Sequence, residues 1–147
     1  MSDDVLFFQE FSIMGKDFSN AGSVSTEIKS ILKEIGFDRL VIRRAAIASY
    51  EAEMNVVMYA ERAVVRLSAT PTTIKIEFED EGQGIENIDL AMQEGYSTAT
   101  PEMREMGFGA GMGLPNIKRN ADDLKISSGV GKGTKLGITI RTNQSDG

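Results

Sequence analysis

The chain contains neither cysteine nor histidine. Without cysteine it forms no disulfide and carries no thiolate nucleophile, which fits the reducing cytoplasm where we expect the protein to act. Without histidine it holds no Ser-His-Asp triad, no His-ligated metal and no phosphohistidine. Any proton transfer by this chain therefore falls to carboxylates, lysine or tyrosine.

Long apolar runs and an excess of positive charge are also missing. Lys and Arg number 16 against 22 Asp and Glu, a net charge of −6, so no basic footprint for nucleic acid or an anionic membrane is present. No apolar run reaches transmembrane length, and the first residues lack a signal-peptide layout. With 147 residues, 41% of them hydrophobic, one domain covering residues 1–147 is expected.

Glycine is plentiful, and it occupies every second position in one short stretch before Pro115. Such a backbone can approach a ligand closely, and exposed N–H groups before a helix favour an anion such as phosphate. A flexible loop is the alternative, and the stretch alone leaves both open. The candidate phosphate-binding residues of this glycine run are Gly107, Gly109, Ala110, Gly111, Met112, Gly113 and Leu114.

Hydrophobic periodicity predicts an alternation of helices and strands. A helix over residues 23–35, with Ser23 as its N-cap and Gly36 at its end, has apolar residues at helical spacing. A second, longer helix is predicted from Arg39 to about Glu61, and a third from the glycine run towards Leu124. Strands are predicted over residues 5–13, 63–69, 74–79, 124–128 and 134–141, the last two as a hairpin.

Two polar positions on the long helix are candidates for chemistry. Glu51 and Asn55 are four residues apart, so they share one helix face. A carboxylate and an amide among apolar neighbours need partners, because burying them unpaired is costly. An exposed pair on a solvated face is the alternative.

A third signal follows the strand at residues 74–79. Asp80, Gly82 and Gly84 place an acid at a strand end before a loop that can approach a flat ligand, although a plain turn is the alternative. Residues 86–106, polar and ending in the glycine run, are predicted to form a lid. The Walker fingerprint is absent, since Gly133 follows Lys132 where Ser or Thr is needed. The G-x-G-x-x-G dinucleotide fingerprint also fails, both at Gly82 and at Gly107 to Gly113.

Taken in order, these signals resemble the ATP-site boxes of the GHKL ATPases, which include gyrase, Hsp90, histidine kinases and MutL. The resemblance spans residues 40–140 and includes Gly131, Gly133 and Thr134 on the last strand. Within that superfamily the chain is most similar to the stand-alone serine kinases of bacterial partner-switching systems, of the anti-sigma-factor and stressosome type. This resemblance implies a two-layer α/β sandwich of the Bergerat type, with helices on one face of a mixed sheet.

The resemblance also implies a role for each candidate residue. Asp80 would accept the adenine amino group, with Thr134 nearby through water, and Gly82 and Gly84 would admit the purine. Asn55 would hold Mg²⁺ and Glu51 would be the general base. The glycine run from Gly107 to Leu114 would hold the ATP phosphates, and the lid would close over them.

A Mg²⁺-ATP-dependent serine/threonine kinase acting on a STAS-domain regulator is the implied function. Because the chain has no histidine and no further domain is expected, the phosphoacceptor should lie on another protein. Two alternatives are an anti-sigma factor that sequesters a sigma factor, and a nucleotide-gated binding module without kinase activity. A downstream phosphatase is a further implied partner, and a homodimer is left open.

Overall fold

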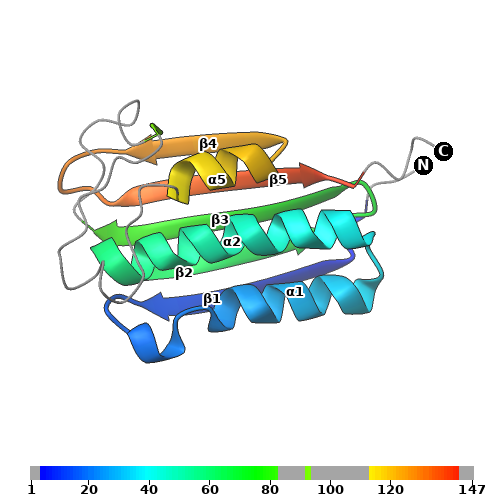
Figure 1. Cartoon of the computed structure of the whole chain (residues 1–147), viewed down its shortest axis with the longest axis horizontal. Coiled ribbons are helices and arrows are strands. Elements are labelled where there is room, and N and C mark those ends of the chain that lie inside the picture. Colours follow the sequence, from blue (N-terminus) through cyan, green and yellow to red (C-terminus); the bar gives the residue numbers. More distant parts are fainter. Residues whose placement is uncertain (1–3, 83–91, 94–112, 143–147) are drawn as a thin grey trace.

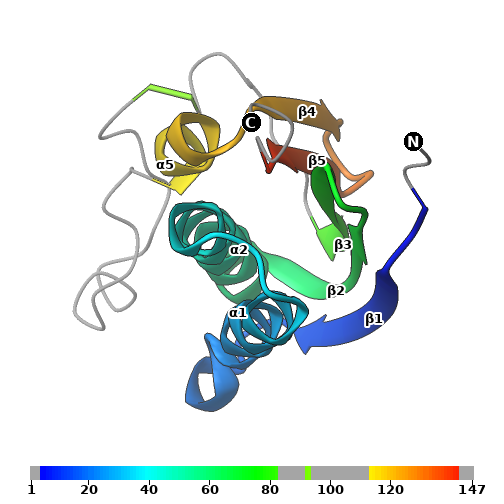
Figure 2. The ribbon, with the colours of Figure 1, turned by 90° about the vertical axis from the view of Figure 1, so that its right-hand side faces the viewer.

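The computed structural model of the chain describes residues 4–82, 92–93 and 113–142. It is a two-layer α/β sandwich in which the helices α1, α2 and α5 cover one face of a five-stranded sheet (Figure 1, Figure 2). The predicted sandwich is confirmed. The expected mixed sheet is not, because every strand pairing in the described residues is antiparallel.

The strand order β1-β2-β3-β5-β4 explains this correction. Helix α5 lies between β3 and β4 in the chain, so β4 forms the far edge and β5 turns back antiparallel between them. The elements are β1 Phe7–Met14, η1 Phe18–Asn20, α1 Ser23–Ile35, α2 Arg39–Tyr59, β2 Ala60–Ala69, β3 Thr73–Gly82, α5 Gly113–Asn120, β4 Asp123–Ser128 and β5 Thr134–Arg141.

These bounds differ from the predicted ones at several element ends, and β1, predicted over 5–13, covers Phe7–Met14. Strand β2 begins at Ala60, where the predicted second helix was expected to continue, and β3 runs on through Asp80 to Gly82. Helix α5 ends at Asn120, and Leu124 belongs to β4 instead. The apolar spacing that suggested a longer helix arises because Leu124 packs against the same core from a strand.

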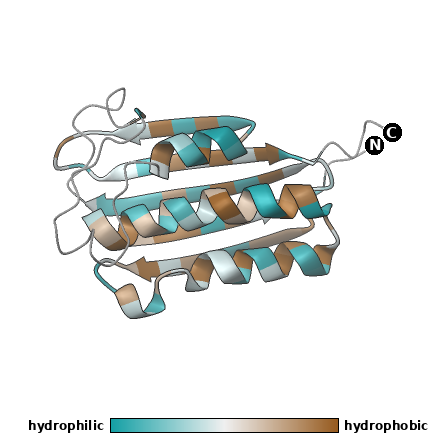
Figure 3. Cartoon of the chain, viewed as in Figure 1, coloured by the Kyte–Doolittle hydropathy of each residue, from teal (hydrophilic) through white to brown (hydrophobic). Residues whose placement is uncertain are grey.

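The sheet buries alternate residues, as its sequence pattern predicts. Ile74, Ile76 and Phe78 of β3 are buried under the helices, while the residues between them face outward. Figure 3 shows the same alternation of hydrophobic and hydrophilic positions along the strands. On the open face, Arg66 pairs with Glu10, Glu77 and Glu79, so charged side chains cover that side.

Helix α1 packs against α2 through apolar side chains, among them the fully buried Ile28 and Leu32. Gly36 ends α1 in the left-handed conformation, with φ 99°, as predicted. At the other end the N-cap is Gly22, and Ser23 is the first helical residue, so the predicted cap is one residue off. Among the described helices, none is long and apolar enough to cross a membrane.

Candidate functional site

Helix α5 lies antiparallel along α2, and its first residue contacts one of the predicted site residues. A Cβ added to Gly113 would lie 3.2 Å from Oδ1 of Asn55, so glycine is the residue that lets the helix start come this close. Gly113 also closes the predicted phosphate-binding run. The structure therefore joins two motifs that are far apart in sequence.

One helical turn further along, α5 reaches the second predicted residue of α2. Nδ2 of Asn116 donates to Oε2 of Glu51 at 3.1 Å. Nη1 of Arg119 donates to Oδ1 of the same amide at 3.0 Å, which fixes the amide with its N–H₂ towards Glu51. Glu51 and Asn55 are both half-buried, so the alternative of a fully solvated pair is wrong.

The far end of α5 is anchored by Arg44, on the same face of α2 as Glu51. Its Nε donates to the carbonyl of Asn120 at 3.1 Å, and its Nη2 lies 3.2 Å from Oδ1 of Asp122. Burial raises the pKa of Asp122, but hydrogen bonds from the Arg141 backbone and Arg44 outweigh it and hold the pKa below its ordinary value. These contacts hold α5 in one register on α2.

Asp80 meets β5 at the end of the sandwich where α2 and β3 end and β5 begins (Figure 1). Its Oδ1 accepts from the backbone N–H of Thr134 at 3.0 Å, and the Thr134 hydroxyl lies 2.8 Å from that of Ser128. Burial raises the pKa of Asp80, and the Thr134 N–H opposes part of that rise. Asp80 and Thr134, both predicted to lie near the adenine, are therefore direct neighbours in the structure.

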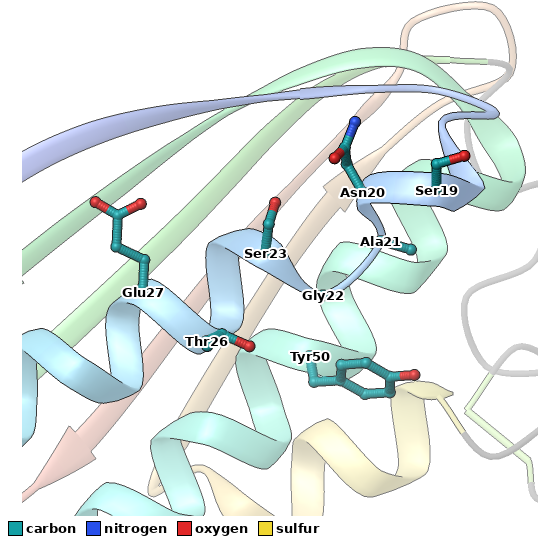
Figure 4. Close-up of a pocket in the computed structure, with 8 residues that line it drawn as sticks. All are labelled: Ser19, Asn20, Ala21, Gly22, Ser23, Thr26, Glu27 and Tyr50. Atoms are coloured by element: carbon teal, nitrogen blue, oxygen red, sulfur yellow. The ribbon is translucent and has the colours of Figure 1, made fainter.

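Of two hollows on the described surface, one contains predicted site residues and the other does not. Asp80 and Thr134 line a hollow of about 380 Å³ together with Ser128 and Lys132. The other, of about 560 Å³, lies at the N-terminus of α1 and is lined by residues that include Gly22 and Tyr50 (Figure 4). The backbone N–H groups of Gly22, Val24 and Ser25 there are already bonded to Glu53, so these three are not offered to an anion.

Gly82 has a packing role that the sequence did not indicate. It lies opposite Ala60, where the β2–β3 register shifts, and an added Cβ would lie 3.1 Å from Cα of Ala60. Leu114, predicted to belong to the phosphate loop, is buried in the core at the start of α5. The remaining predictions lie outside the described residues: Gly84, Gly107, Gly109, Ala110, Gly111, Met112 and all of the lid at 86–106 except 92–93.

Sequence reasoning did not assign a role to two residues that shape the site. Asn116 is three residues after Gly113, so the helix spacing could have placed it on the same face. Gly133 has φ 75°, and a side chain there would collide with the Asp80 carbonyl oxygen. Its place in the Gly131-x-Gly133-Thr134 pattern was the available signal.

The chain is similar in sequence to known proteins. The chain is 30% identical over 112 residues to the serine/threonine-protein kinase RsbT of Bacillus subtilis (strain 168), covering 74% of this chain and 78% of that one. It is 33% identical over 118 residues to the anti-sigma F factor of Clostridium acetobutylicum, covering 78% and 75%.

The fold of a solved structure is also similar. The RsbU and RsbW domains of Rv1364c from Mycobacterium tuberculosis match with a TM-score of 0.59 at 20% identity, over 90% of this chain and 32% of that one. This chain therefore spans about a third of that protein. The profile described as histidine kinase-, DNA gyrase B-, and HSP90-like ATPase matches residues 40–144, which include every predicted site residue. The chain belongs to this ATPase family, and its domain binds ATP.

Proposed function

We propose that this protein is a Mg²⁺-ATP-dependent protein-serine/threonine kinase of the partner-switching type, with a STAS-domain regulator as its acceptor. The observation that supports this most is the seam between α2 and α5. There Asn55 contacts Gly113 and Glu51 contacts Asn116, so a carboxylate and an amide meet the end of the glycine run. A kinase needs a base, a cation ligand and a phosphate cradle at one place.

The adenine end of the site rests on Asp80 in this proposal. One carboxylate oxygen is held by the Thr134 N–H, and Oδ2 has no hydrogen bond within the described part of the chain. That oxygen is free to accept from the adenine amino group, with Thr134 adding a water-mediated contact. Gly82 and Gly84 would flank the purine, and the residues from Gly107 to Leu114 would offer backbone N–H groups to the phosphates.

Asn55 is the residue we assign to the cation. Its carboxamide oxygen is a hard ligand of the kind that Mg²⁺ prefers. Within the described residues no group of three or more acidic side chains is placed to hold a metal ion, so most other ligands would have to be phosphate oxygens and water. The cation supplies neutralisation of charge on the phosphates.

Glu51 has the proton-accepting role. As the serine oxygen of the acceptor forms its bond to the γ-phosphorus, the bond from that phosphorus to the bridging oxygen breaks and ADP leaves. The proton of the serine hydroxyl passes to the Glu51 carboxylate. Pure nucleotide binding needs Asn55 and the glycines but no such base, which favours a kinase over a simple binding module.

Replacing Glu51 with Gln tests this function. Purified STAS-domain proteins of the source organism are incubated with the kinase, Mg²⁺ and γ-labelled ATP, and ATP binding is measured by calorimetry. We expect Glu51→Gln to bind ATP within about twofold of the parent and to lose roughly 100-fold or more in transfer rate. Glu34→Gln, an exposed change on α1, is the matched control. Unchanged transfer by Glu51→Gln would contradict the assignment.

Sequestration of a sigma factor is the second candidate function. It is favoured by the relatives named anti-sigma F factor, which are 31–33% identical to this chain. Pull-downs with and without ATP separate the two candidates. Recovery of a sigma factor and of no STAS-domain protein would favour the second.

A further inference from the structure

We propose that Asn116 is a positioning residue that orients the carboxylate of Glu51 for proton transfer. This inference rests on the proposed function and adds a residue to it. The reaction is unchanged: the serine proton passes to Glu51 as the new oxygen–phosphorus bond forms and ADP departs. Asn116 acts only through Glu51 and itself contacts neither nucleotide nor acceptor.

The direction of the Asn116 amide is determined by its neighbours. The guanidinium of Arg119 can only donate, so the amide atom that it contacts, at 3.0 Å, is the oxygen. The N–H₂ group therefore points the other way and donates to Oε2 of Glu51 at 3.1 Å. Arg119 thus holds Asn116 in the one orientation that serves an ionised Glu51.

The hydrogen bond leaves the carboxylate with two unlike oxygens. Oε2 is occupied by Asn116, whereas Oε1 has no hydrogen bond within the described residues. A free glutamate samples many side-chain rotamers, and fixing one of them avoids part of that entropy loss during the reaction. Asn116 therefore selects Oε1 as the oxygen that receives the proton.

The same helix also sets the position of the cation ligand. Gly113 lies beside Asn55, and three residues later Asn116 donates to Glu51, so the helical rise fixes the spacing of these two points on α5. Arg44 holds the far end of α5 through the Asn120 carbonyl. Base and cation ligand are therefore aligned by one element that begins where the phosphate-binding run ends.

A purely structural role for Asn116 makes a different prediction. If the amide only fastened α5 to α2, its loss would loosen the start of α5 and weaken ATP binding. A positioning role lowers the rate of transfer while ATP binding is kept. The two roles also differ in whether the loss depends on the presence of the Glu51 carboxylate.

The test is a double-mutant cycle of Asn116→Leu and Glu51→Gln, with ATP affinity and single-turnover transfer to a STAS-domain acceptor measured for each protein. We expect Asn116→Leu alone to transfer about tenfold more slowly, the usual effect of one lost hydrogen bond to a charged group. Its ATP affinity should stay within about twofold of the parent. In the Glu51→Gln background, Asn116→Leu should have no further effect.

Asn120→Ala is the matched control, because it removes a hydrogen bond within α5, to the Asn116 carbonyl, without touching Glu51. We expect its transfer rate to equal that of the parent. An equal loss from Asn116→Leu in both backgrounds, a loss confined to ATP affinity, or no loss at all would overturn the positioning role alone. Full transfer by Glu51→Gln would overturn the proposed base and, with it, this inference.

Discussion

Glu51 and Glu53 are two residues apart on α2, yet they lie in opposite environments. Glu53 is 1% exposed and accepts from the backbone N–H groups of Gly22, Val24 and Ser25, at 3.0, 3.2 and 2.8 Å. Glu51 is half-buried and accepts from the Asn116 side chain alone within the described residues. Residues two apart on a helix point to nearly opposite sides, so one faces α1 and the other α5.

This difference separates a structural carboxylate from one available for chemistry. The hydrogen bonds of Glu53 supply the missing cap of α1, whose own N-cap residue Gly22 has no side chain to do so. Both of its oxygens are occupied. Oε1 of Glu51 has no hydrogen bond within the described residues, so a substrate hydroxyl could donate to it while Asn116 remains bonded to Oε2. The α1 side of α2 serves stability, and the α5 side carries the residues of the proposed site.

The largest expected effect comes from removing the buried carboxylate. Glu53→Ala leaves buried backbone donors at the start of α1 without an acceptor, and the free energy of unfolding should fall by about 3 kcal/mol. Glu51→Gln should change it by less than about 0.5 kcal/mol. Urea unfolding of both variants measures this contrast. Equal losses would mean that the two carboxylates do not divide their roles as described.

Asp80→Asn should weaken ATP binding while making the folded protein more stable at pH 7. The change removes a charged acceptor for adenine, and ATP affinity should fall roughly tenfold or more. Burial raises the pKa of Asp80, so the folded state binds its proton more tightly, and stability decreases as the pH rises through that pKa. The Asp80→Asn variant should therefore have a higher melting temperature than the parent protein at pH 7.

The melting difference should shrink as the pH falls below the ordinary value of 3.8, where the parent's Asp80 is protonated in both states. Calorimetry with ATP and melting curves over this pH range measure both effects. Glu61→Gln, an exposed change on the neighbouring strand β2, is the control. A lower melting temperature for Asp80→Asn at pH 7 would contradict the account of this site.

Gly113→Ala tests the close approach of α5 to Asn55. The added methyl group would crowd Oδ1 at 3.2 Å and displace the amide, so Mg²⁺-ATP binding should weaken about fivefold. Gly137→Ala is the matched change, since its methyl group would meet Lys125 at an ordinary 3.8 Å. Similar affinities for the two variants would show that Asn55 does not need this contact.

Arg44→Ala should have the smallest effect. It removes partly exposed contacts to Asn120 and Asp122, and should cost less than about 1 kcal/mol. The lowered pKa of Asp122 means that its stabilisation is present above its unfolded pKa and is lost as the pH falls through its folded pKa. The variant should therefore lose part of this acid dependence. Hydrogen exchange in α5 should quicken, whereas exchange in α1 should not.

The helices and strands were predicted well where a regular hydrophobic spacing is followed by a residue that ends the element. The alternation in β3 and the spacing of α1 before Gly36 are examples, because each reports burial along one local element. Partners across elements were harder. The closeness of Gly113 to Asn55 follows from the packing of α5 on α2, and that of Asp80 to Thr134 follows from the strand order. Before the structure, only the resemblance to a family had placed these residues in one site.

The sequence contains no local pattern that identifies which side chains pair between helices. Nothing in the order of Glu51 and Glu53 indicates which one the α1 cap uses, because that depends on how α1 packs against α2. Likewise, the Asn116 amide is recognised as a partner of Glu51 only once the register of α5 on α2 is known. Local propensity cannot encode such register, since it is set by tertiary packing.

The most direct test is a crystal structure with Mg²⁺ and a non-hydrolysable ATP analogue. The account predicts Mg²⁺ about 2.1 Å from Oδ1 of Asn55, the Glu51 carboxylate facing the γ-phosphate, and the adenine amino group on Asp80. A nucleotide seated instead in the hollow beside Gly22 and Tyr50, with Asn55 and Glu51 turned away from its phosphates, would contradict it.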